Sequence, residues 1–205
     1  AVAPRRAGLR YPSMSMTHRA EAELLAANSN FSFAASHSES MRALEHTMQR
    51  IAPTNLPILL VGESGTGKAL IAHRVHQLST RHKEPFLQAI CSDVTAEAVA
   101  EYFDGAGRRG NGSAGSGTLF LKEINELSSA NQRSLLSSIV ERDSRPGGDS
   151  GGVRLLSSTT VDLEGEVAAS RFRRDLYYRL KGVCLHLPPL RECKGDVPAL
   201  AEVLL

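Results

Sequence analysis

Hydrophobic positions along this chain alternate between the spacing of buried strands and that of amphipathic helices. Short apolar runs predict five strands, at residues 58–61, 86–90, 118–121, 153–158 and 183–187. Between them, helical spacing predicts helices, the clearest of which carry Leu70, Ile71, Val75 and Leu78, or Leu135, Leu136, Ile139 and Val140. This alternation predicts an α/β fold with a doubly wound parallel sheet, whose ligand binds at the carboxyl ends of the strands.

A further helix is predicted before the first strand. Ser36 and Glu39 have the spacing of a capping box, and Pro53 ends the helix. The helical face between them carries Met41, Leu44, Met48 and Ile51. A short helix is also expected from Thr95 to Phe103. Two stretches rich in Gly and Ser, 105–117 and 144–152, interrupt the alternation and are expected to be flexible surface loops.

The most informative segment directly follows the first predicted strand and reads Gly62-Glu63-Ser64-Gly65-Thr66-Gly67-Lys68. A strand, a glycine-rich turn ending in Gly-Lys and then a helix is the arrangement that holds a nucleotide triphosphate. Main-chain N–H groups and the helix N-terminus face the phosphates, and Lys68 reaches the outer ones. The match to G-x-x-x-x-G-K-[ST] fails only at Ala69, which lacks a hydroxyl. The alternative is a glycine-rich turn without a ligand.

Length and composition limit the number of domains and the class of partner only loosely. A chain of 205 residues is long enough for one domain and a fragment of a second. The charges are nearly balanced, with 24 Lys+Arg and 22 Asp+Glu, so the composition does not require a nucleic-acid or membrane partner. Cys91, Cys184 and Cys193 lack metal-ligand spacing, so we expect a reducing, cytoplasmic environment and no zinc site. No apolar run approaches the ~20 residues of a membrane span.

A phosphate-binding loop usually has an acidic pair at the end of a neighbouring strand, where one carboxylate binds magnesium and the next activates water. The candidate is GTLFLKE, residues 117–123, in which Glu123 has the position of the base. Lys122 has the position of the magnesium ligand, and an ammonium group cannot bind a cation. Lys122 is therefore either a tethered charge that replaces the metal or a sign that hydrolysis is lost. We favour the second interpretation and expect no resident metal.

From about Ser36 onward, the chain resembles the central AAA+ ATPase domain of sigma-54-dependent bacterial transcription activators. GESGTGK, GTLFLKEI, RFRRDLYYRL and LPPLRECKGDVPALAE carry the resemblance, in the family's order. It implies a P-loop fold that binds ATP between subunits of a ring, usually a hexamer, and remodels RNA polymerase carrying sigma-54.

The resemblance also implies roles for individual residues. Lys68 would contact the β- and γ-phosphates, and Glu123 would position the attacking water. Arg173 and Arg179 match the arginines that reach a neighbouring subunit's nucleotide, where guanidinium charge neutralises the transition state. The alternative is that these two arginines are ordinary surface residues of an amphipathic helix.

Five departures from the family lie at its reacting and coupling positions. Ala69 stands where the family has a Glu, and Lys122 stands where it has the Walker B Asp. Ile90 replaces an Asn that restrains the catalytic Glu, and Thr160 replaces an Asn that follows a later strand. The glycine-rich segment 104–116 replaces the loop whose Gly-Ala-Phe-Thr-Gly-Ala motif contacts sigma-54. Together they predict a degenerate ATPase that binds ATP with weak or absent hydrolysis, and they argue against contact with the sigma-54 polymerase.

The domain organisation follows from these assignments. We expect a linker or disordered segment at 1–35, an AAA+ nucleotide-binding domain at 36–188, and the start of a helical lid at 189–205. An Arg-rich leader peptide is the alternative for the first segment. Neither the remaining lid helices nor a DNA-binding helix-turn-helix is found in these residues, so the predicted lid face is expected to lack part of its cover. That apolar face comprises Val197, Leu200, Ala201 and Leu204.

Three hypotheses for function remain open. The first is an active ATPase that remodels sigma-54 polymerase, and the second is an ATP-binding, hydrolysis-poor subunit acting beside an active relative. The third is an interaction module that retained the fold and lost the nucleotide. The glycines and Lys68 argue against the third, and Lys122 favours the second over the first.

Overall fold

The computed structural model describes residues 38–96, 98, 117–144 and 152–198, all within one compact unit that spans residues 31–205. At its centre is a five-stranded sheet of order β2-β3-β4-β1-β5, in which every pairing is parallel. The strands are β1 (Ile58–Val61), β2 (Phe86–Ile90), β3 (Thr118–Lys122), β4 (Arg154–Thr159) and β5 (Val183–His186). All five predicted strands are confirmed, with ends that differ by at most one residue.

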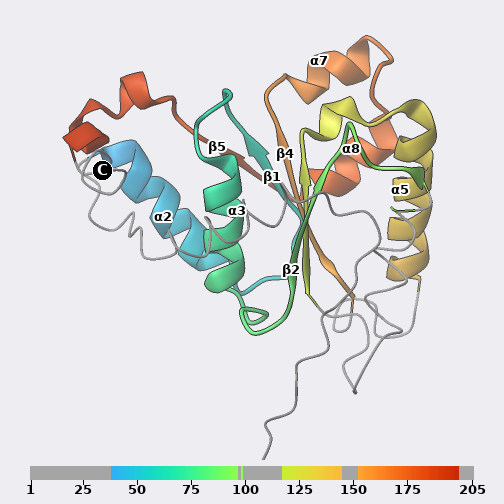
Figure 1. Ribbon diagram of the computed structural model, residues 1–205, viewed down its shortest axis with the longest axis horizontal. Coiled ribbons are helices and arrows are strands. Elements are labelled where there is room, and N and C mark those ends of the chain that lie inside the picture. Colours follow the sequence, from blue (N-terminus) through green and yellow to red (C-terminus); the bar gives the residue numbers. More distant parts are fainter. Residues whose placement is uncertain (1–37, 97, 99–116, 145–151, 199–205) are drawn as a thin grey trace, which may run out of the picture. The chain divides into compact units, whose positions relative to one another are not determined.

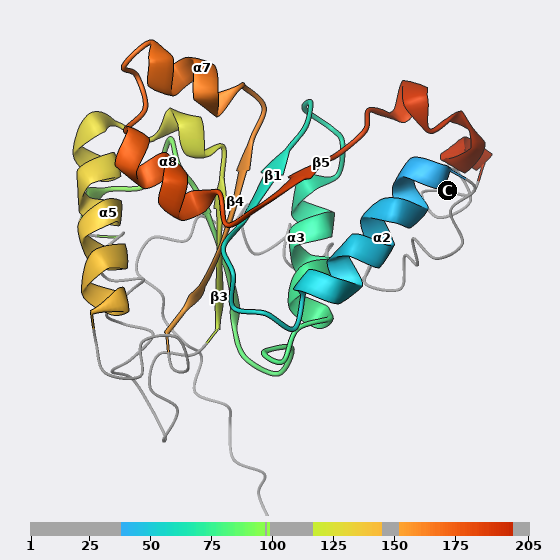
Figure 2. The same cartoon turned by 180° about the vertical axis from the view of Figure 1, so that it is seen from behind.

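Helices cover both faces of the sheet, as Figures 1 and 2 show from opposite sides. Helices α2 (Glu39–Ile51) and α3 (Lys68–Gln77) lie on one face, and α5 (Ser129–Asp143) and α8 (Arg174–Leu180) lie on the other. The short helix α7 (Leu163–Ala168) and the 3-10 turn η3 (Ile124–Glu126) follow the carboxyl ends of β4 and β3. The predicted α/β, doubly wound architecture is therefore confirmed.

Each face of the sheet has its own hydrophobic core, because parallel strands covered by helices are buried on both sides. The α2–α3 side buries Met48, Ile58, Leu60, Ile71, Val75, Phe120 and Leu156. The α5–α8 side buries Leu59, Leu119, Leu121, Leu135, Ile139, Leu155 and Leu176. Adjacent residues of β1 and β3 thus face opposite cores, which fixes the side on which each strand-end residue emerges.

The predicted start of one helix is wrong. Helix α2 begins at Glu39, after the expected start, and Ser38 precedes it without capping it through its side chain. The predicted cap, Ser36, lies outside the described residues, and the Ser38 N–H donates to Asp196 Oδ1 at 3.0 Å, a tertiary contact. In α5, Leu135 and Ile139 are buried, but Val140 is 39% exposed and lies at the edge of the helix's apolar face.

A buried arginine connects α2 to the sheet. Arg154, at the start of β4, donates to the carbonyl oxygens of Ala52 (2.6 Å) and Ile51 (3.1 Å), at the C-terminal end of α2. Burial lowers the pKa of Arg154 to about 10. The C-terminal carbonyls of a helix carry partial negative charge, so they stabilise this guanidinium without a carboxylate partner.

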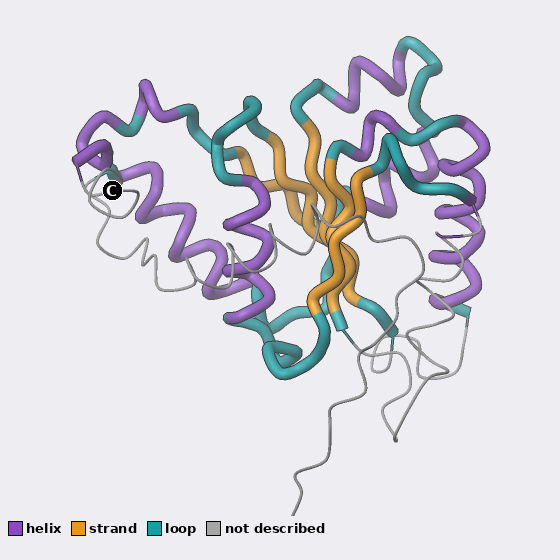
Figure 3. The backbone as a smooth tube through the Cα atoms, in the orientation of Figure 1, coloured by secondary structure: helices purple, strands orange, loops and turns teal. Residues whose placement is uncertain are grey.

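After β5, the chain crosses to the α2 side of the sheet (Figure 3). This segment contains the 3-10 turns η4 (Leu190–Glu192) and η5 (Lys194–Asp196), and Asp196 there accepts the bond from Ser38. Val197 is 43% exposed, whereas the other residues of the predicted lid face lie outside the described residues. So do residues 1–37, most of the predicted helix 95–103 and most of both predicted loops.

None of the described helices is long and apolar enough to cross a membrane. Cys91, Cys184 and Cys193 are all free thiols, and Cys91 and Cys193 are buried.

Candidate nucleotide-binding site

The glycine-rich turn 62–67 connects the carboxyl end of β1 to the N-terminus of α3. Gly65 and Gly67 have φ values of 81° and 85°, in the left-handed region that favours glycine. The Thr66 N–H donates to Glu63 O at 3.3 Å, whereas the N–H groups of Gly65, Gly67 and Lys68 have no acceptor within the described part of the chain. Free N–H groups at a helix N-terminus form an anion-binding site, so this turn is shaped for phosphate.

The Lys68 side chain folds back over the turn. Its ammonium group donates to the carbonyl oxygens of Gly62 (2.9 Å) and Glu63 (3.0 Å), and it lies 3.4 Å from Glu123 Oε1. Only 9% of the Lys68 side chain is exposed. The structure therefore places a positive charge inside the turn, where the outer phosphates of a nucleotide would lie.

Glu123 directly follows β3 and lies beside Lys68. Its φ of 52° is unusual for a residue with a side chain, and its N–H donates to Ser158 Oγ at 3.3 Å. The second carboxylate oxygen, Oε2, accepts from the N–H and the hydroxyl of Thr160, both at 3.0 Å. The sequence assigned the base to Glu123, and the fold brings that carboxylate to the phosphate-binding turn.

A contact that the sequence did not reveal links the turn to the segment after β5. Arg191 donates to both oxygens of Glu63, from Nη1 at 2.8 Å and from Nη2 at 2.6 Å. The Arg191 guanidinium lowers the pKa of the Glu63 carboxyl. The sequence places Arg191 in the LPPLRE motif, but nothing in that motif indicates that its partner is Glu63.

The residues around the turn do not fit a resident magnesium ion. Lys122, the last residue of β3, has an ammonium group where a carboxylate would be needed, and Ala69 has no hydroxyl. Within residues 38–96, 98, 117–144 and 152–198, no cluster of three or more His, Cys, Asp or Glu side chains could hold a metal.

The two arginines assigned to a neighbouring subunit lie at the other face of the sheet. Arg173 precedes α8 and pairs with Asp175, with Nη2 2.7 Å from Oδ2. Arg179, in the last turn of α8, pairs with Asp143 of α5 at 2.7 Å. All four side chains are 40–49% exposed, so these ion pairs are weak and can exchange for another anion.

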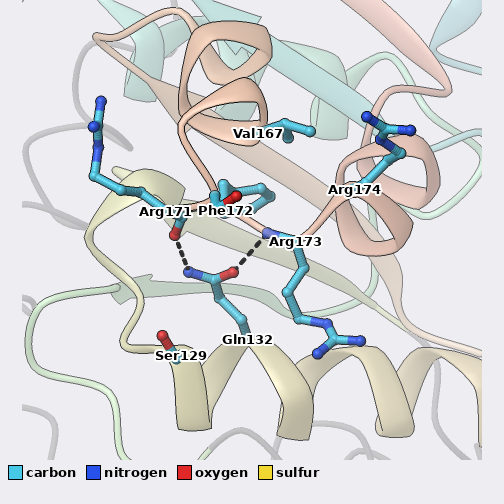
Figure 4. A pocket seen from close by; sticks show the side chains of 8 residues that line it. Ser129, Gln132, Val167, Arg171, Phe172, Arg173 and Arg174 are labelled. Carbon is cyan, nitrogen blue, oxygen red and sulfur yellow. Dashed lines mark hydrogen bonds between the residues drawn. The ribbon is translucent and has the colours of Figure 1, made fainter.

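Beside Arg173 is a pocket of about 340 Å³, shown in Figure 4, lined by Ser129, Gln132, Val167, Ser170 and residues 171–174. Gln132 of α5 is its central polar side chain and is 2% exposed. Its amide donates to the carbonyls of Leu127 (3.0 Å) and Arg171 (3.1 Å), and its oxygen accepts from the Arg173 N–H at 2.9 Å. Gln132 thus holds the main chain that presents Arg173.

Comparison with known proteins gives the family. The model of the sigma-54 interaction domain matches residues 34–186. The chain belongs to this family. A Nif-specific regulatory protein of Sinorhizobium fredii is 42% identical over 183 residues, 82% of this chain and 31% of that protein. The response regulator PilR of Pseudomonas aeruginosa is 39% identical over 184 residues, 82% of this chain and 41% of that protein.

Solved structures agree with this assignment. NtrX from Brucella abortus, in a complex with ADP, superposes with a TM-score of 0.69 at 30% identity, over 91% of this chain and 45% of that one. NtrX in a complex with ATP superposes with a TM-score of 0.68 at 29% identity, over 91% of this chain and 46% of that one. This sigma-54 interaction domain therefore corresponds to less than half the length of each of these three proteins.

Proposed function

We propose that this sigma-54 interaction domain binds ATP at residues 62–69 and hydrolyses it slowly or not at all, as a regulatory subunit of a transcription activator. The observation that carries the proposal is the Lys68 ammonium, which donates to the carbonyls of Gly62 and Glu63 inside the turn. The N–H groups of Gly65, Gly67 and Lys68 in this turn have no acceptor among the described residues. Main-chain N–H groups supply most of the contacts to a phosphate in such a site. Lys68 supplies a mobile point charge that can leave these carbonyls for the outer phosphates.

Slow hydrolysis follows from the chemistry of position 122. A carboxylate there would anchor the divalent ion that neutralises the transferred phosphoryl group, and the Lys122 amine cannot do so. The amine does offset phosphate charge, so we infer that ATP binds without a magnesium requirement. Glu123 remains able to accept a proton from water, but the charge that develops on the phosphate is stabilised less well.

We also infer that the nucleotide lies between subunits of a ring. Arg173, which precedes α8, and Arg179, in its last turn, lie on the face of the sheet opposite α3, where they pair with Asp175 and Asp143. Their place on the face opposite α3, the helix that follows the turn 62–67, supports a role at a neighbouring subunit's nucleotide rather than at their own. Contact with RNA polymerase carrying sigma-54 is not part of this proposal, since segment 104–116 lacks the family's contact motif.

Calorimetric titration with ADP and ATP, in magnesium and in excess chelator, tests nucleotide binding. We expect ATP to bind in both conditions, and Lys68→Met to weaken binding at least tenfold, on the order of one lost charge-assisted contact. Lys83→Met is a matched control, because Lys83 is exposed and lies outside the turn. Binding that disappears on chelation would refute the role of Lys122, and absence of binding in both conditions would favour the interaction module.

The active ATPase is the second candidate, and the geometry of Glu123 favours it. The carboxylate lies 3.4 Å from Lys68 and is already fixed by Thr160. Steady-state ATP turnover by the unmodified protein separates the two candidates. Turnover in the usual range for enzymes, above about 1 s⁻¹, would support the active ATPase and overturn the slow one.

A further inference from the structure

A cysteine and a histidine lie side by side on strand β5. Cys184 Sγ is 3.4 Å from His186 Nε2, and the two side chains share one face of the strand because they are two positions apart. Cys184 is partly buried and His186 is exposed, whereas Cys91 and Cys193 are buried. Of the three thiols, Cys184 is therefore the one that a solute reaches most easily.

The separation of these two atoms is close to that of neighbouring ligands in a tetrahedral metal site. Zinc binds a thiolate sulfur at about 2.3 Å and an imidazole nitrogen at about 2.0–2.1 Å, and two such bonds at a tetrahedral angle place the ligand atoms about 3.5 Å apart. Cys184 and His186 can thus bind one ion with little movement of their side chains.

The charges around Cys184 nearly cancel. Lys181, at the C-terminal end of α8, and Glu164 of α7 both act on its pKa, and these two side chains pair with each other at 2.5 Å. Burial is the largest influence and raises the pKa of the Cys184 thiol. A metal ion must therefore displace the thiol proton, but no unpaired cation of α8 repels it.

One copy of the chain supplies too few ligands for a stable site. Structural zinc sites have four protein ligands. Within residues 38–96, 98, 117–144 and 152–198, no third His, Cys, Asp or Glu joins this pair to form a metal-binding cluster. The missing ligands must come from another molecule.

Strand β5 has a side that can receive a second strand. It lies at the edge of the sheet, and the N–H groups of Val183 and Leu187 donate toward β1. Because main-chain groups alternate along a strand, those of Cys184 and His186 face away from β1, where no strand of the described residues pairs with them. Such an unpaired edge is a template for pairing with another chain.

A second β5 strand, antiparallel and related by a two-fold axis at Leu185, completes the ligand set. This pairing places Cys184 of each copy opposite His186 of the other, with Cα atoms about 5.5 Å apart. Opposed side chains lie on the same face of a sheet. The two copies then supply two thiolates and two imidazoles, a common set for zinc, and the thiolates neutralise the charge of the ion.

We propose that Cys184 and His186 form half of a tetrahedral zinc site, which the same two residues of a second copy complete across the β5 edge. The site is incomplete in one chain, so metal binding and pairing of the copies are one event. The proposal is independent of nucleotide binding. It departs from the expectation of no zinc site, which considered the spacing of the cysteines alone.

Cobalt titration of the reduced chain, without nucleotide, tests the ligands and the stoichiometry. Cobalt substitutes for zinc in such sites, and its absorption bands distinguish tetrahedral thiolate coordination from octahedral coordination. We expect tetrahedral bands and one ion per two chains. Adding zinc to chelator-treated protein should double its mass in sedimentation. One ion per chain, octahedral bands or an unchanged mass would each overturn the proposal.

Variants of His186 separate a ligand from a structural residue. His186→Gln should lower the zinc affinity at least tenfold and abolish the doubling of mass, whereas His186→Cys, which retains a ligand, should keep both. His46→Gln, at an exposed histidine of α2, is the matched control. A doubling that persists in His186→Gln would contradict the proposal.

The pH dependence identifies the thiol. Because burial raises the pKa of Cys184 and the metal displaces its proton, the zinc affinity of the unmodified protein should increase with pH. The same affinity at about pH 6 and about pH 8 would exclude a thiolate ligand.

Discussion

The Arg191 guanidinium donates two hydrogen bonds, 2.8 Å and 2.6 Å long, to the carboxylate of Glu63, which lies 128 positions earlier in the sequence. One partner belongs to the phosphate-binding turn and the other to the 3-10 turn η4. This contact ties the segment after β5 directly to the nucleotide site. The contact therefore joins the turn to the residues that begin the predicted lid.

We predict that Glu63→Gln loosens η4 without lowering the thermal stability of the protein. Exposed ion pairs contribute little to stability, and both side chains are more than half exposed. The N–H groups of Glu192 and Cys193, bonded within η4, should exchange faster with deuterium, whereas Tm should be unchanged. Glu141→Gln, an equal charge change on α5, is the control. Unchanged exchange in the Glu63 variant would mean that Arg191 does not order this turn.

The same contact has a defined pH dependence. The Arg191 guanidinium lowers the pKa of Glu63 from its ordinary value of 4.5. A carboxyl with a lowered pKa keeps its contact above that ordinary value and loses it as the pH falls through the lowered pKa. Protection of η4 should therefore be constant from neutral pH down to about pH 4.5 and decrease only below it.

We predict that Lys122→Asp increases ATP hydrolysis. The aspartate supplies the hard oxygen ligand that magnesium needs, beside a base already held by Thr160. The rate should rise on the order of tenfold to a hundredfold, measured as phosphate release with saturating magnesium. Lys122→Ala removes the amine without adding a ligand and should show no such gain. Equal rates in the Asp and Ala variants would show that position 122 does not limit the reaction.

His76 should make the protein less stable in acid. It is 4% exposed, its Nδ1 lies 2.9 Å from Thr118 Oγ1, and burial, together with the nearby His73, lowers its pKa from 6.5 to about 4. The folded state therefore binds fewer protons than the unfolded state between these values, so the free energy of unfolding rises with pH across this window. The gain is about 2–3 kcal/mol.

Urea unfolding of the wild type and His76→Gln from pH 4 to pH 7 measures this contribution. In the variant, the free energy of unfolding should rise much less with pH over this range than in the wild type, because glutamine does not titrate. His46→Gln, which alters an exposed histidine of α2, should keep the wild-type slope. Parallel curves for the wild type and the His76 variant would contradict the prediction.

Gln132→Ala should destabilise the fold by about 2–4 kcal/mol, because it leaves two carbonyls and one N–H without their partner in a buried place. Urea unfolding checks this, with the exposed Gln49→Ala of α2 as the control, for which a change below about 0.5 kcal/mol is expected. A Gln132 variant as stable as this control would show that the loop before α8 is held by other contacts.

The strands were the part of the fold most predictable from the sequence. Residues 58–61 and 119–121 are apolar throughout, because helices cover both faces of the sheet. The contact between Ser38, at the start of α2, and Asp196 was not predictable, because the two residues are 158 positions apart in the sequence. Likewise, Val140 fits the helical pattern of α5 but lies at the margin of the buried face.

For the candidate site, the sequence by itself determined which chemical groups are present: the glycine-rich turn, Lys68, Glu123 and the amine of Lys122. Local spacing suffices for this, because a phosphate-binding turn is built from consecutive residues. Only the tertiary structure decided the partners of these groups, namely Thr160 for Glu123 and Arg191 for Glu63. Those pairs depend on strand order and on the path of the chain after β5, and side-chain contacts between distant segments form only once the sheet is assembled.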